Sequence, residues 1–153
     1  MNARILVVDD EEIIVRSCVR ILDGGDYAVD AARDGAEALR KVDENPYDVV
    51  ILDIMMPKVD GMEVLQRVKE MHPAIEVIMV TGLSQIDTAV RSMTLGAFDY
   101  LSNPFDQAAL KLVVKRALER RQLLQENFEL RSEVSSKYRF ENIIGSSPQM
   151  QNV

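Results

Sequence analysis

Three short runs of apolar residues constrain the fold of this chain more than any other feature. They are ILVV at 5–8, DVVIL at 48–52 and EVIMV at 76–80. They do not alternate polar and apolar residues, which is typical of strands covered on both faces in a parallel sheet. Two weaker strand candidates are YAVDAA at 27–32 and FDYL at 98–101. The sequence therefore predicts five strands in an α/β fold.

Apolar residues at helical spacing follow each predicted strand. The five groups are Ile13, Ile14, Cys18, Ile21 and Leu22; Ala36, Leu39 and Val42; Val64, Leu65 and Val68; Ala89, Val90, Met93 and Leu95; and Leu110, Val113, Val114 and Ala117. Asp106 precedes the last group and is suited to cap that helix. Strand–helix repeats joined by right-handed crossovers give an open, doubly wound parallel sheet. In such a sheet the site lies beyond the carboxyl ends of the strands.

Acidic and polar residues gather in the loops expected at those strand ends. Asp9 and Asp10 follow the first strand, Asp53 ends the third, Thr81 ends the fourth and Asn103 follows the fifth. The three carboxylates carry a combined charge of about −3, which is costly without a counter-charge. Hard oxygen ligands with no cysteine or histidine nearby suit Mg²⁺. The alternative is a solvated sheet rim that binds nothing.

The charge of the chain is unevenly distributed. The formal net charge is −7, and residues 1–106 carry 10 basic and 20 acidic side chains. An acidic body does not follow phosphate backbones, so we expect no direct nucleic-acid binding by this segment. Glu11 and Glu12 are better assigned to the first turn of a helix, where acids stabilise the macrodipole, than to metal ligation.

Cysteine content and hydropathy indicate the compartment. The single cysteine, Cys18, excludes an internal disulfide bond and fits a reducing environment. The N-terminus lacks a basic-then-apolar signal sequence, and no apolar run approaches the length of a membrane span. The sequence therefore predicts a cytoplasmic protein without membrane contact.

Four separated motifs carry a family resemblance. VVDDEE, LDIMMPKVDG, VTG and YLSNPF at this spacing resemble the receiver domain of two-component response regulators, over about residues 3–120. Together with the strand–helix alternation, the resemblance implies a flavodoxin-like (βα)5 fold. Its five-stranded parallel sheet would have the strand order 2-1-3-4-5.

The resemblance also implies the chemistry of the acidic loops. Asp53 would be the phosphoacceptor and would take a phosphoryl group from a sensor histidine kinase. Asp10, Asp53 and the main-chain carbonyl of Met55 would hold Mg²⁺, and Asp9 would bind the metal through water. A carboxylate is a poor nucleophile toward phosphorus unless a metal shields both charges, so these roles agree with the physical chemistry.

Three further positions carry implied roles. Thr81 would hydrogen-bond the phosphoryl group and Tyr100 would be an aromatic switch, although a satisfied loop hydroxyl and simple edge packing are alternatives. Asn103 departs from the family, which has a lysine before the Pro-Phe of this loop. An amide supplies no fixed cation, so the metal must do most of the charge balancing. The resemblance implies a cis Asn103–Pro104 peptide bond.

The C-terminal part predicts a helical extension. No proline or glycine interrupts residues 106 to about 137, and Leu123, Asn127, Leu130 and Val134 fall at coiled-coil a/d spacing. A homodimer is therefore expected, with a single polar-flanked helix as the alternative. FENIIGSSPQMQNV (140–153) resembles the opening of the AAA+ domain of nitrogen-regulation-type activators, which remodel sigma-54 RNA polymerase. The predicted division is a receiver domain at 1–120, a helical linker at 121–139 and a truncated AAA+ domain at 140–153.

Three functions compete for this sequence. The first is a phosphorylation-controlled receiver that regulates downstream AAA+ and DNA-binding domains and catalyses only its own phosphorylation and dephosphorylation. The second is a pseudo-receiver that signals by protein contacts, which Asn103 favours. The third is an enzyme such as an aspartyl-phosphate phosphatase. That enzyme needs a carboxylate two residues after the nucleophile, where this chain has Met55.

Overall fold

The computed structural model describes residues 3–23, 27–54, 56, 60–82, 86–124 and 126. The chain divides into two compact units, residues 1–121 and residues 122–153. The elements are β1 (Ala3–Val8), α1 (Glu12–Leu22), β2 (Tyr27–Ala32), α2 (Gly35–Glu44), β3 (Val49–Asp53), α3 (Gly61–Met71), β4 (Glu76–Gly82), α4 (Ile86–Thr94) and β5 (Asp99–Asn103). A C-terminal helix then spans residues 107–124.

The five strands form one parallel sheet in the order β2-β1-β3-β4-β5. The predicted doubly wound, flavodoxin-like fold is therefore confirmed. Val8 pairs with Leu52, and Asp53 pairs with Val80. This register brings the residues that follow β1, β3 and β4 to the same edge of the sheet, where the sequence predicted the site.

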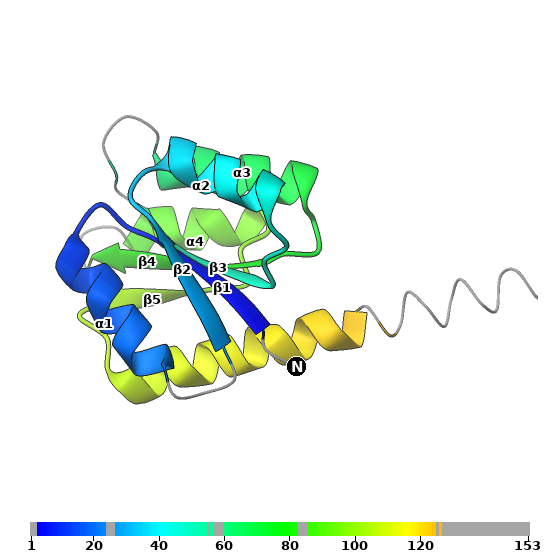
Figure 1. The fold of residues 1–153 in the computed structure, drawn as a ribbon. Helices are drawn as coiled ribbons and strands as arrows, with labels where there is room; N and C mark the ends of the chain where they lie inside the picture. The colour runs from blue at the N-terminus through cyan, green and yellow to red at the C-terminus, as the bar shows by residue number, and fades with distance from the viewer. Residues whose placement is uncertain are drawn as a thin grey trace, which may run out of the picture. The chain divides into compact units, whose positions relative to one another are not determined.

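Both faces of the sheet are covered by helices, which form two apolar cores. Along β1, Leu6 and Val8 belong to one core cluster, whereas Ile5 and Val7 belong to the other. The first cluster includes residues of α2, α3 and α4, and the second includes residues of α1 and the C-terminal helix (Figure 1). Because the apolar side chains at 5–8, 49–52 and 77–80 are buried on both faces of the sheet, the central strands read as continuous apolar runs.

Two of the predicted helical stripes differ from the observed buried faces. In α1, Cys18 and Leu22 are buried, but Ile13 is 76% exposed. In α4, Ala89 is buried together with Ser92, whereas Met93 is exposed. Val90 and Leu95 are exposed as well.

The buried serine explains the error in α4. The Ser92 hydroxyl donates a hydrogen bond to the Ala89 carbonyl at 2.5 Å, so its polar group is satisfied inside the protein. A hydropathy pattern ranks Met93 above Ser92 for burial and therefore misplaces the packed face of this helix.

The loop after β5 has the predicted features. The Asn103–Pro104 peptide bond is cis. Asp106 caps the C-terminal helix, because its Oδ1 accepts a hydrogen bond from the Ala109 N–H at 2.7 Å. Both expectations for this loop are confirmed.

Several expectations concern residues outside the described part of the chain. Asn127, Leu130 and Val134 of the proposed coiled coil and the AAA+-like segment at 140–153 fall there, so the division at 120 and 139 stays a prediction. The main-chain carbonyl of Met55 falls there as well. Within the described ranges, none of the helices combines the length and the apolar character that crossing a membrane requires.

Gly61 lets the loop after β3 close against the end of that strand. A Cβ atom at this position would lie 2.2 Å from the Asp53 carbonyl oxygen and 2.8 Å from Ile54 Cα. The Gly61 N–H donates to the Ile54 carbonyl at 2.9 Å, and the preceding Asp60 side chain caps α3 by accepting from the Met62 N–H. Gly61 thus packs directly against the backbone of Asp53, and only a residue without a side chain fits there.

Replacing Gly61 with alanine should destabilise the protein by about 1–3 kcal/mol, because the added methyl group overlaps backbone atoms that cannot rotate away. Alanine is otherwise the better helix former, so helix propensity alone predicts a gain in stability for this substitution. Urea unfolding measures the difference. The exposed Gln66→Ala in α3 is the control, and a loss in Gly61→Ala no larger than in this control would contradict the close-approach argument.

Candidate functional site

Three carboxylates converge at the carboxyl ends of β1 and β3. Asp9 and Asp10 follow β1, and Asp53 is the last residue of β3. One oxygen of each lies within 4.8 Å of the others. At such a distance two full charges repel by about 3 kcal/mol at an effective dielectric constant of about 20. The fold therefore creates a strongly negative point that a cation would stabilise.

The three acids differ in burial. Asp9 is only 4% exposed, Asp53 is half-buried and Asp10 is exposed. The Asp9 carboxylate accepts a hydrogen bond from the Glu11 N–H at 2.9 Å. The pKa of Asp9 is raised to about 6, mainly by burial and to a lesser extent by the charges of Asp10 and Glu11. The hydrogen bonds from the Glu11 N–H and with the Asp53 side chain oppose this rise. At neutral pH, Asp9 is thus an ionised carboxylate in a place that disfavours its charge.

The donor set fits a hard divalent cation. All three groups are carboxylates, and they offer one oxygen each to a common point. Mg²⁺ is usually bound by one or two carboxylates, and water completes its octahedral shell. Three acids at different depths suit this pattern, since Asp10 and Asp53 are more accessible than the buried Asp9.

The ends of β4 and β5 bring the remaining predicted residues to the same edge. Thr81 pairs with Ser102, and Gly82 pairs with Asn103. Thr81 is buried, and its Oγ1 donates a hydrogen bond to the Gly82 carbonyl at 2.7 Å. This is the satisfied loop hydroxyl that the sequence left as an alternative. The Thr81 hydroxyl would have to rotate to meet a ligand.

Tyr100 lies on β5 and is half-buried against the core cluster beneath α2, α3 and α4. Its backbone N–H donates to the Asp99 side chain at 2.8 Å. Packing at the sheet edge is therefore its observed role, and a switch role stays a prediction.

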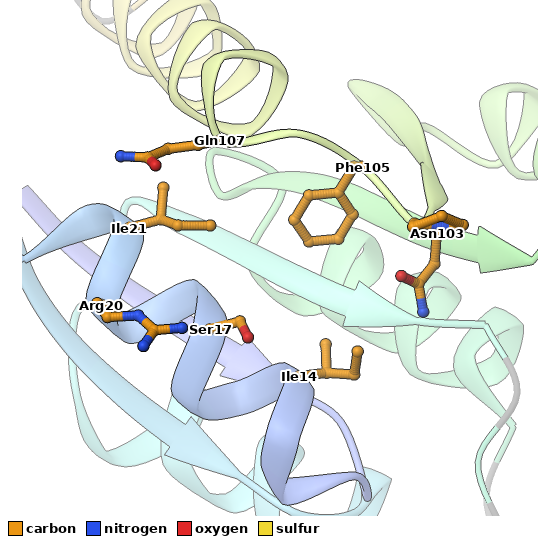
Figure 2. Close-up of a pocket in the computed structure, with 8 residues that line it drawn as sticks. Ile14, Ser17, Arg20, Ile21, Asn103, Phe105 and Gln107 are labelled. Atoms are coloured by element: carbon orange, nitrogen blue, oxygen red, sulfur yellow. The ribbon is translucent and has the colours of Figure 1, made fainter.

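Asn103 lies at one end of a cavity of about 510 Å³ between α1 and the loop after β5. Figure 2 shows the Asn103 amide at one end and Arg20 toward the other, with the ring of Phe105 between the two elements. The lining residues are Ile14, Ser17, Arg20, Ile21, Asn103, Pro104, Phe105 and Gln107. Sequence reasoning missed this cavity, because it depends on how far α1 stands from the loop after β5.

Glu12 has the role that its position favoured. It lies in the first turn of α1, and its carboxylate is 3.4 Å from Arg16 and 3.7 Å from Arg33. All three side chains are largely exposed, so these pairs contribute little to stability. Glu12 therefore forms ion pairs with surface arginines and is not part of the acidic cluster.

A model of the response regulator receiver domain matches residues 5–115. The regulatory protein AtoC of Escherichia coli is 33% identical over 98% of this chain, which corresponds to 32% of AtoC. A putative NtrX-like response regulator of Rickettsia typhi is 36% identical over 87% of this chain and 28% of its own length. This chain thus spans about a third of the length of these relatives.

Solved structures are similar in fold as well. NtrX from Brucella abortus superposes with a TM-score of 0.81 at 36% identity, covering 85% of this chain and 30% of NtrX. A response regulator receiver domain protein from Clostridium thermocellum superposes with a TM-score of 0.76 at 38% identity, covering 80% of this chain and 98% of that protein.

The raised pKa of Asp9 predicts a pH-dependent effect of its charge on stability. Between the unfolded value of 3.8 and the folded value of about 6, the folded chain binds more protons, so stability falls as pH rises through this window. Without divalent cations, Asp9→Asn should therefore stabilise the protein by about 3 kcal/mol at pH 8, and most of this gain should be lost at pH 4.

Urea unfolding at pH 4 and pH 8 measures this difference. Asparagine is the suitable replacement, because its side-chain oxygen can still accept the hydrogen bond from the Glu11 N–H. Asp23→Asn, an exposed acid at the far end of α1, is the control and should show no such dependence. An equal effect of Asp9→Asn at pH 4 and pH 8 would show that its buried charge is not the cause.

Proposed function

Because the chain belongs to the response regulator receiver domain family, we propose that it is a phosphorylation-controlled signalling domain with Asp53 as the phosphoacceptor. The single observation that carries the proposal is the cluster of Asp9, Asp10 and Asp53 at the carboxyl ends of adjacent strands. A lone carboxylate repels an incoming phosphoryl group, whereas one in a metal-binding cluster can act as a nucleophile.

Asp53 suits the acceptor role by its placement. It ends a central strand, is half-buried and has its backbone packed against Gly61, so its carboxylate has a fixed position. Mg²⁺ held by Asp10 and Asp53, with Asp9 behind them, would neutralise the charge that develops on the transferred group. The main-chain carbonyl of Met55 is the further ligand implied by the family.

Thr81 is the proposed hydrogen-bond donor to the bound phosphoryl group. Its hydroxyl donates to the Gly82 carbonyl in the unmodified protein, so phosphorylation would exchange one partner for another. We propose that this exchange is the first structural response. Tyr100, two residues along β5 from the Ser102 that pairs with Thr81, would then change its packing.

A pseudo-receiver is the second candidate, and Asn103 is the observation that favours it. A neutral amide stands at the position where the family has lysine, so the phosphoryl group would lack a fixed cation. A catalytic activity on other molecules is not part of the proposal. We propose that any chemistry is limited to gain and loss of the chain's own phosphoryl group.

The partners follow from the proposed role. A sensor histidine kinase would supply the phosphoryl group, and the exposed Ile13 in the first turn of α1 would offer an apolar contact for such a donor. Downstream AAA+ and DNA-binding domains in the full-length protein would receive the signal, in a sigma-54-dependent activator. A homodimer through the helical extension and a cytoplasmic location complete the proposal.

Intact mass measured after incubation with a small-molecule phosphoryl donor tests this function. With Mg²⁺ the chain should gain the mass of one phosphoryl group, and it should gain none with chelator or in Asp53→Asn. Asp23→Asn, which removes an exposed acid remote from the cluster, should behave as the unchanged protein.

The same measurement separates the two candidates. No gain of mass by the unchanged protein, together with a gain by Asn103→Lys, would favour the pseudo-receiver and assign the loss of phosphorylation to the missing cation. No gain by either protein would contradict the phosphoacceptor proposal itself.

A further inference from the structure

The last turn of the first unit carries two arginines that reach the opposite end of the sheet from the acidic cluster. Arg121 Nε lies 2.7 Å from Asp48 Oδ1, and its Nη1 donates to the Ala74 carbonyl. Asp48 immediately precedes β3, and Ala74 lies two residues before β4. Arg121 therefore connects the helix to the starts of two central strands. Its partner Asp48 is 73 positions away in the sequence.

Arg120 makes the second connection. Its Nε lies 3.4 Å from Glu76 Oε2, and its guanidinium stacks over the Phe98 ring at 5.6 Å from the ring centre. Glu76 is the first residue of β4 and is only 3% exposed. Its Oε2 accepts no hydrogen bond from the described residues, so the ion pair with Arg120 is what compensates this buried oxygen.

Lys69 adds charge to the same region. Its ammonium donates to the Pro73 and Ile75 carbonyls at 2.9 and 2.8 Å. Burial lowers the pKa of Lys69, and the Glu76 charge opposes that effect. Glu76 thus interacts with the charges of both Lys69 and Arg120, and it would lose the second of these cations if the helix end moved away.

The rest of the helix is held differently. Leu110, Val113, Val114 and Ala117 are buried in the core cluster that includes α1, whereas Arg120 is about half exposed. Leu118, the last apolar residue in that cluster, is only partly buried. The helix is therefore attached by apolar packing up to Leu118 and by ion pairs after it.

We propose that Arg120 and Arg121 form a latch that fixes the end of the C-terminal helix to β3 and β4. The latch opens as a unit while the apolar part of the helix stays packed. When closed, it fixes residues 118–121 of the helix; when open, it frees them. The strands that it holds are β3, which ends at Asp53, and β4, which carries Thr81 next to its last residue, so the latch lies at the other end of the elements that carry the site.

The proposal does not depend on phosphorylation, because every contact that supports it is remote from the acidic cluster. The latch also gives the buried Glu76 carboxylate a role, which is to bind Arg120. An apolar residue at the start of β4 would pack without needing a counter-charge, whereas Glu76 requires a cation from the helix. The helix end is thus recognised by charge rather than by shape alone.

Amide hydrogen exchange of the full chain, followed residue by residue by NMR, tests the latch. In Arg121→Gln the amides of residues 118–121 should exchange about tenfold faster, while those of residues 110–117 keep their rates. High salt should accelerate the same amides in the unchanged protein, because it screens ion pairs whose arginines are in part exposed to solvent. Arg116→Gln is the matched control, since Arg116 is exposed on the same helix, and it should leave these rates unchanged.

A charge-removal cycle tests the Arg120 half of the latch. Arg120→Gln should accelerate exchange at residues 118–121, and adding Glu76→Gln should cause no further acceleration, because the ion pair between the two side chains is already broken. Three results would overturn the proposal: unchanged exchange in Arg121→Gln, an equal effect in Arg116→Gln, or a double variant with faster exchange than Arg120→Gln alone. Uniform acceleration along the whole chain would also overturn it, because the latch would then be part of the global fold.

Discussion

Repulsion among Asp9, Asp10 and Asp53 is the constraint on which the rest of the site depends. The register of β1 and β3 brings their carboxylates within 4.8 Å, and the apolar strands that precede them leave no freedom to move apart. Burial of Asp9 increases the cost, as its pKa of about 6 indicates. A folded chain at neutral pH therefore keeps an unfavourable cluster of negative charge, and a divalent cation is the partner that most directly relieves it.

Residues and helices that do not belong to the cluster hold its three carboxylates in place. Gly61 allows the chain to close against the carbonyl of Asp53, and Asp60 caps the helix that follows. Each strand that ends at the cluster is covered on both faces by helices (Figure 1). At the opposite end of the sheet, Asp48 and Glu76 hold the C-terminal helix through arginines. The two ends of β3 and β4 thus carry separate charged sites joined by rigid apolar strands.

Sequence patterns predicted the parts of the structure that depend on local order. Continuous apolar runs indicated strands covered on both faces, and a parallel sheet then requires Asp9 and Asp53 to approach one another. The patterns failed where burial depends on the neighbouring element. Ile13 has the hydropathy of a core residue but faces outward, and Ser92 is buried because its hydroxyl finds a partner within its own helix. The pairing of Asp48 with Arg121, 73 positions apart, has no local signature at all.

Because Asn103 supplies no positive charge, a divalent cation is the proposed counter-charge of the cluster. Since an amide leaves the site more negative than lysine would, Mg²⁺ should bind the unchanged protein at least as tightly as it binds Asn103→Lys. Calorimetric titration of Mg²⁺ into both proteins at the same pH and ionic strength measures this difference. Equal or tighter binding by the Asn103 form is the predicted result, and weaker binding by that form would contradict the electrostatic account of the site.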